Sequence, residues 1–151
     1  MAKVFERILV PTDFGAPAGK ALDLAARLAT EFDSELVVAH CWEFPAYAYS
    51  DLTNPGTDFI VALEHAASEE LAKTLALVHK EVPRARSLLR NGVPWQEILT
   101  VVEELHSDLV VMGTRGRRGV KHVLLGSVAE KVVRLSPVPV LTVHGDPAAA
   151  D

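Results

Sequence analysis

Residues 108–127 read DLVVMGTRGRRGVKHVLLGS. The first six residues form a short apolar run, which predicts a fully buried strand. Glycines follow at positions 113, 116, 119 and 126. Because glycine leaves backbone N–H groups unobstructed, a loop of this kind can wrap an anion. A helix predicted from about residue 128 directs the positive end of its dipole into the same loop. The segment therefore predicts a strand, an anion-binding loop and a helix.

The loop is also strongly basic. Its cationic residues are Arg115, Arg117, Arg118, Lys121 and His122. It matches neither of two familiar phosphate-binding patterns: it has no Gly-Lys-Ser/Thr, and it does not follow the first strand as a Rossmann loop does. A second interpretation stays open, in which this is a surface loop whose basic side chains are only solvated.

Short apolar runs alternate with stretches of helical period over the rest of the chain. We predict strands at residues 6–11, 35–42, 85–92, 108–113 and 138–143, and helices at 16–32, 58–81, from 94, and at 128–135. Strands rich in Val, Ile and Leu that are separated by helices predict a doubly wound α/β domain, with a parallel sheet and helices on both faces. Ligands bind such sheets at the carboxyl ends of the strands. Two unusual stretches, PTDFG (11–15) and MGTRG (112–116), fall there.

Size and charge narrow the class of protein. The 151 residues predict one domain, residues 1–145, with a loose tail at 146–151. A formal net charge of −5 argues against a general nucleic-acid or anionic-membrane binder. A single cysteine cannot form an internal disulfide. No metal site is expected, because the six histidines include no close pair of ligands. No signal-peptide pattern follows Met1, and no apolar run reaches the roughly 20 residues of a membrane span. We expect a cytoplasmic protein.

The glycine spacing carries a resemblance. The loop has the pattern Gly113-x-x-Gly116, followed by nine residues and then Gly126-Ser127. This pattern resembles the signature of the ATP-binding branch of the universal stress protein family. ILVPTDFG at 8–15 is similar to the first strand of that family, and SPVPVLTV at 136–143 to its last. The resemblance covers nearly the whole chain. It implies a five-stranded parallel sheet of order 3-2-1-4-5, with the nucleotide over the carboxyl ends of the first and fourth strands.

The resemblance also implies a set of binding residues. The resemblance would place four residues beside the adenosine: Pro11, Thr12, Asp13 and Cys41. The ribose would lie over Met112 and Gly113, and the phosphates nearer Arg115 and Gly116. The phosphates would receive backbone amides from Gly126, Ser127, Val128 and Ala129. The implied ligand is ATP, with AMP or ADP as alternatives, and Mg²⁺ would arrive with the nucleotide. A homodimer formed by antiparallel pairing of the last strand, Val138 to Val143, is implied as well; the alternative is an edge shielded by the tail.

Several of these residues also fit purely structural roles. Asp13 could cap the helix that begins near residue 16. Ser127 and Glu130 match the capping box S-x-x-E, and we assign Glu130 to capping. Cys41 fits a small buried hydrophobe, and His40 a structural residue. The chain has Gly15 where many relatives have a serine, which removes a hydroxyl from the edge of the pocket or the helix cap.

The function that these features predict is binding with slow or negligible hydrolysis, because no carboxylate is placed to orient water beside the glycine loop. The leading hypothesis is an ATP-responsive stress or signalling module. Its alternative is a dimeric scaffold that binds AMP, a cyclic nucleotide or no nucleotide. A response-regulator receiver would need an aspartate at the end of the third strand, where this chain has Arg90-Asn91-Gly92. The aromatic loop at 43–57 would either cover the nucleotide, contact a second subunit or be disordered.

Overall fold

Strands and helices alternate strictly along the chain. The computed structural model describes residues 2–44, 56–115 and 125–145. Their elements are β1 (Arg7–Pro11), α1 (Ala16–Phe32), β2 (Glu35–Trp42), α2 (Gly56–Val78), β3 (Arg86–Asn91), α3 (Pro94–Leu105), β4 (Leu109–Gly113), α4 (Ser127–Leu135) and β5 (Val140–Val143). Among these, no helix is both long and apolar enough to cross a membrane.

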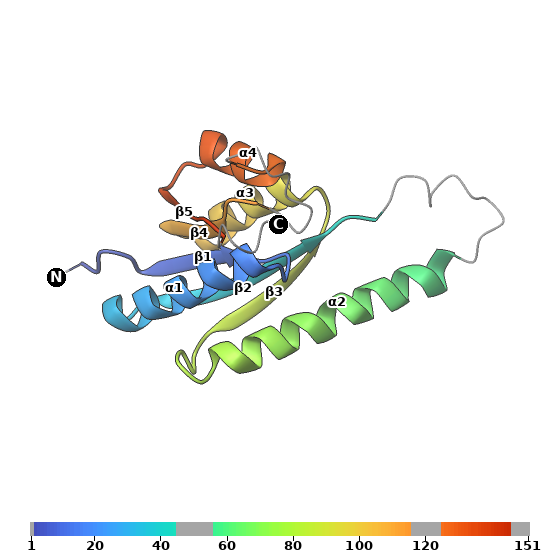
Figure 1. The fold of residues 1–151 in the computed structure, drawn as a ribbon, viewed down its shortest axis with the longest axis horizontal. Coiled ribbons are helices and arrows are strands. Elements are labelled where there is room, and N and C mark those ends of the chain that lie inside the picture. The colour runs from blue at the N-terminus through green and yellow to red at the C-terminus, as the bar shows by residue number, and fades with distance from the viewer. Residues whose placement is uncertain (1, 45–55, 116–124, 146–151) are drawn as a thin grey trace.

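The five strands form one parallel sheet of order β3-β2-β1-β4-β5, which confirms the predicted fold class (Figure 1). The chain builds outward from β1 to β3, then crosses back to place β4 on the other side of β1. The strand order therefore reverses beside β1, so the crevice of the fold lies at the carboxyl ends of β1 and β4.

Two layers of helix cover the sheet. Side chains of a strand alternate between its faces. Accordingly, Ile8 and Val10 pack in one apolar cluster with α1 and α2, while Leu9 packs in a second with α3 and α4. Figure 1 shows α1 and α2 together on one face, with α3 and α4 on the other. Burial on both faces explains why these strands read as continuous apolar runs rather than as alternating ones.

Two elements differ by two or more residues from the bounds that the sequence pattern predicts. The helix predicted over 58–81 spans Gly56–Val78, because the amides of Glu81 and Val82 both bond to the carbonyl of Val78 in a closing turn. The last strand starts at Val140 rather than residue 138, since Pro139 has no N–H to contribute to the ladder. The predicted tail 146–151 and loop residues 45–55 lie outside the described part of the chain.

Candidate functional site

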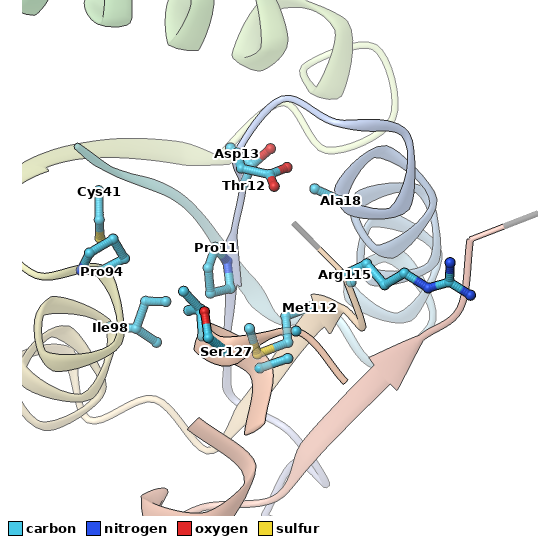
Figure 2. Close-up of a pocket in the computed structure, with 14 residues that line it drawn as sticks. Pro11, Thr12, Asp13, Ala18, Cys41, Pro94, Ile98, Met112, Arg115 and Ser127 are labelled. Carbon is cyan, nitrogen blue, oxygen red and sulfur yellow. The ribbon is translucent and has the colours of Figure 1, made fainter. Parts of the chain in front are cut away.

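A cavity of about 180 Å³ lies at the carboxyl ends of β1 and β4, where the topology predicts a ligand crevice (Figure 2). Its lining residues are Pro11, Thr12, Asp13, Ala18, Cys41, Pro94, Ile98, Met112, Gly113, Arg115, Gly126, Ser127, Val128 and Ala129. Eleven of the twelve residues predicted to bind nucleotide are among them. The twelfth, Gly116, lies outside the described residues. The structure thus gathers the predicted residues around one cavity, and their contact with a nucleotide stays a prediction.

The turn from β1 into α1 forms one wall and is held by side-chain hydrogen bonds. The Thr12 hydroxyl accepts a hydrogen bond from the Phe14 N–H at 3.0 Å, and Asp13 Oδ1 accepts one from the Gly15 N–H at 2.8 Å. Asp13 therefore stabilises the turn and does not cap the helix: the N-cap of α1 is Gly15, which makes no side-chain capping bond. The alternative prediction, in which Asp13 caps α1, is therefore wrong, because the cap lies two residues later at Gly15.

His40 supports the same turn from β2. Its Nδ1 lies 2.7 Å from the carbonyl oxygen of Thr12, to which it donates a hydrogen bond. Its ring also packs against Phe14, with ring centroids 4.4 Å apart. This contact holds Phe14 at φ 66°, a left-handed conformation that is uncommon outside glycine. His40 is a structural residue of the site, as the sequence predicts.

The opposite wall is the start of α4. Gly126 is its N-cap, in extended geometry with φ −68° and ψ 168°, and no side chain caps the helix. The Gly126 N–H donates to the carbonyl of Thr114 at 2.6 Å, which ties the start of the helix to the end of β4. The first helical bond runs from the Glu130 N–H to the Gly126 carbonyl at 2.9 Å. The amides of residues 127–129 precede that bond, so no intrahelical acceptor reaches them.

The capping-box prediction is wrong for this reason. Because the helix starts one residue earlier than predicted, Ser127 is its first residue and not its cap. Glu130 then stands one position too far along to reach back to the cap. Its carboxylate instead lies 3.6 Å from the Arg134 guanidinium, in an exposed ion pair one turn further along α4.

Three helices begin around the cavity, and they differ in the amides they present. α1 carries Pro17 in its first turn, and α3 begins with Pro94. Proline has no N–H, so each of these ends loses one donor. α4 has no proline in its first turn and keeps all of its donors. Of the three helix starts, that of α4 therefore offers an anion the most hydrogen-bond donors, and the positive end of the helix dipole adds to their attraction.

An apolar corner lies at the carboxyl end of β2, where Figure 2 shows Cys41 with Pro94 and Ile98. Burial raises the pKa of the Cys41 thiol to about 12, and the nearby Glu97 carboxylate adds to the rise. The thiol therefore stays protonated at neutral pH and is not a nucleophile. It serves as a small apolar wall, in keeping with the structural interpretation of this residue.

Three lining residues were missed by sequence reasoning: Ala18, Pro94 and Ile98. All three are apolar residues near the starts of α1 and α3, where they follow the same periodic pattern as the core. Only the convergence of helix starts at this edge of the sheet distinguishes them. Figure 2 also shows the Arg115 guanidinium directed away from the other labelled side chains. The other basic residues of the loop lie outside the described residues.

Comparison with known proteins finds relatives over nearly the whole chain. The model of the Universal stress protein family matches residues 5–144. Universal stress protein YxiE of Bacillus subtilis is 34% identical over 148 residues, which cover 93% of this chain and all of that one. The solved structure of the hypothetical protein MJ0577 of Methanocaldococcus jannaschii superposes with a TM-score of 0.77 at 28% identity, covering 93% of this chain and 96% of that one. The universal stress protein of Archaeoglobus fulgidus, solved in complex with dAMP, shares the fold at 22% identity, with a TM-score of 0.67 over 93% of this chain and 98% of that one.

Proposed function

Because this chain belongs to the universal stress protein family, we propose that it is an ATP-binding stress or signalling module whose nucleotide occupies the cavity at the ends of β1 and β4. The observation that carries the proposal is the uncapped start of α4 in the wall of that cavity. Its free amides suit phosphate oxygens, and the Ser127 hydroxyl beside them adds a further donor.

The other walls fit a nucleoside. One oxygen of the Asp13 carboxylate bonds to Gly15. The other is left for a ribose hydroxyl or an adenine amine, both of which donate hydrogen bonds. The apolar corner of Cys41, Pro94 and Ile98 offers a surface for the flat face of a purine. Adenine nucleotides carry an apolar base, a hydroxylated sugar and anionic phosphates, and the cavity offers a wall of matching chemistry for each.

We expect little or no hydrolysis. Efficient phosphoryl transfer needs a group that orients water near the terminal phosphate. The carboxylate closest in sequence to the start of α4, Glu130, pairs with Arg134 and is exposed. Mg²⁺ would be carried by the phosphates and water, as that ion often is. The module would then act through its bound state rather than through turnover, in a single domain of residues 1–145 that works in the cytoplasm.

A homodimer through the last strand forms part of the proposal. β5 is an edge strand, bonded to β4 on one side only. Its Leu141 side chain is 39% exposed, and Leu135 at the end of α4 is exposed as well. An apolar edge of this kind invites pairing with another strand. Antiparallel pairing of Val138–Val143 with a second copy would satisfy both edges at once.

The direct test is calorimetric titration of nucleotide-stripped protein with Mg·ATP. We expect binding in the micromolar range, about −8 kcal/mol. The variant Gly126→Val should lose it, because a side chain there would stand against the phosphates. The backbone angles of Gly126 are open to any residue, so this variant should fold. Thr100→Val, at an exposed position of α3, is the matched control and should bind as the native protein does.

Absence of binding heat for the native protein at two temperatures would contradict ATP binding. Titration with AMP and with a cyclic nucleotide then separates the alternatives. Binding of either would identify a scaffold that responds to a different adenine nucleotide. Binding of none would leave the dimeric scaffold.

A further inference from the structure

A second hollow, of about 310 Å³, lies between α1 and α2 on the face of the sheet that these helices cover. It shares Thr12 with the first cavity and is otherwise separate from it. One regularly spaced stripe of each helix forms its sides: the N-cap Gly15 with Gly19 and Ala26 of α1, and Thr74 and Leu77 of α2. Residues spaced by three or four positions share one helix face. One stripe of each helix therefore faces the hollow, and the side chains of these stripes do not fill it.

The floor of this groove is apolar. Leu22 and Val78 are buried along it, whereas Leu77 at its rim is 65% exposed. Gly19 keeps the groove open, because a Cβ atom added there would meet no other atom within 4 Å. A large apolar side chain left exposed beside an open groove is a feature of surfaces that receive another apolar group.

The rim of the groove is acidic. Asp23 on α1 contributes one carboxylate, Glu70 on α2 a second, and Glu81 in the turn that follows α2 a third. The lining residues all belong to the described part of the chain, and no basic side chain is among them. Lys73 approaches Glu70 at 3.8 Å, but both side chains are more than half exposed, so this pair contributes little. The groove therefore favours a positively charged occupant.

The length of the groove indicates the form of that occupant. On α1 the lining residues run from the N-cap Gly15 to Ala26, which is eleven steps of 1.5 Å, or roughly 16 Å and three helical turns. We propose that this groove is the docking site of a partner protein that presents a basic amphipathic helix of about three turns. Its apolar residues would pack on Leu22, Leu77 and Val78, and its lysines or arginines would lie against the three carboxylates. The proposal is independent of nucleotide binding in the first cavity.

The probe for the test is a fluorescein-labelled peptide of twelve residues, with leucine at positions 1, 4, 5, 8, 9 and 12 and lysine elsewhere. A matched peptide carries glutamate in place of every lysine. We expect the lysine peptide to bind the native protein by fluorescence anisotropy and the glutamate peptide not to bind. Neutralising the rim with Asp23→Asn, Glu70→Gln and Glu81→Gln together should weaken binding about tenfold, because these charges face the peptide.

The control removes the same charge elsewhere. Glu31→Gln, Glu64→Gln and Glu103→Gln together neutralise three exposed carboxylates that do not line the groove, and should change binding less than twofold. Gly19→Leu places a side chain in the groove from a position where an added Cβ meets no atom within 4 Å, and should abolish binding while leaving the thermal midpoint of unfolding unchanged or higher.

Three results would overturn the proposal. Equal weakening by the rim and control triple variants would show general charge attraction. Undiminished binding to Gly19→Leu would place the peptide elsewhere. Native protein that self-associates in sedimentation, with the rim triple variant or Gly19→Leu remaining monomeric, would make the groove a contact between copies of this chain.

Discussion

Gly113 ends β4 against the first turn of α1, and this close approach requires a residue without a side chain. A Cβ atom there would lie 2.9 Å from both the carbonyl carbon and the Cβ of Pro17. Among the described residues, Gly92 is the one glycine with positive φ, so backbone freedom does not explain position 113. Phe14 shows the opposite case, a large residue in the left-handed region, held there by Thr12 and His40. At these positions, contacts with residues that are near in space determine which residue type fits.

Replacing Gly113 with alanine should lower the free energy of unfolding by about 1–3 kcal/mol, since backbone atoms of α1 must shift to admit the methyl group. Gly19→Ala is the matched control. Its added methyl meets nothing within 4 Å, and alanine favours the helix, so stability should rise by roughly 0.5–1 kcal/mol. Urea unfolding followed by circular dichroism measures both. Equal effects of the two substitutions would refute the packing explanation.

At the scale of elements, the start of α4 decides which hydrogen-bond donors face the cavity. Gly126 takes the N-cap position because its N–H bonds to Thr114 at the end of β4. A serine cap would have occupied one of the amides that the cavity offers. The other decisive element is β5, which closes the sheet on one side and leaves an apolar edge on the other.

Replacing Leu141 with lysine should dissociate the proposed dimer, because a charge on the paired edge would be buried between the two copies. In sedimentation velocity, native protein should run as a dimer and Leu141→Lys as a monomer with an unchanged circular dichroism spectrum. Val61→Lys makes the same change at an exposed position of α2 and should leave the dimer intact. A monomeric native protein at all concentrations would contradict pairing through β5.

Across the whole molecule, the two ends of the sheet have different roles. The carboxyl edge holds the cavity, whereas the amino edge holds a network of ion pairs. Asp33 lies 2.9 Å from both Lys3 and Arg84, and Glu35 lies 2.9 Å from Arg7. The hydrogen bond from Lys3 lowers the pKa of Asp33, and the one from Arg7 lowers the pKa of Glu35. These bonds join segments that are distant in sequence, at the end of the sheet opposite the site. Because most of the side chains are largely exposed, each pair contributes little by itself and their joint contribution is modest.

Acid should therefore weaken the fold slightly through these pairs. The ordinary pKa values of these carboxyls are 3.8 and 4.5, and both are lower in the folded protein. Their stabilising effect is complete above the higher of these values and is lost as the pH falls through the folded pKa values, because the unfolded chain binds protons first. Asp33→Asn with Glu35→Gln should lower stability at pH 7 and flatten its decline below pH 4, as measured by urea unfolding. The control Glu31→Gln should leave the loss of stability at low pH unchanged. If stability falls with pH in parallel for the double variant and the native protein, this network is not the cause.

The type and order of the elements could be predicted from the sequence because they depend on local patterns: the period of apolar residues, and the prolines and glycines that end a helix or strand. The resemblance added the strand order, and with it the residues around the cavity. Three features depended on contacts between distant segments and needed the tertiary structure. Gly126 caps α4 because Thr114 accepts its N–H; Ala18, Pro94 and Ile98 line the cavity because helix starts converge there; and the acidic groove exists because two helices lie apart on one face. Periodicity indicates which face of a helix is buried, but only packing decides what that face meets.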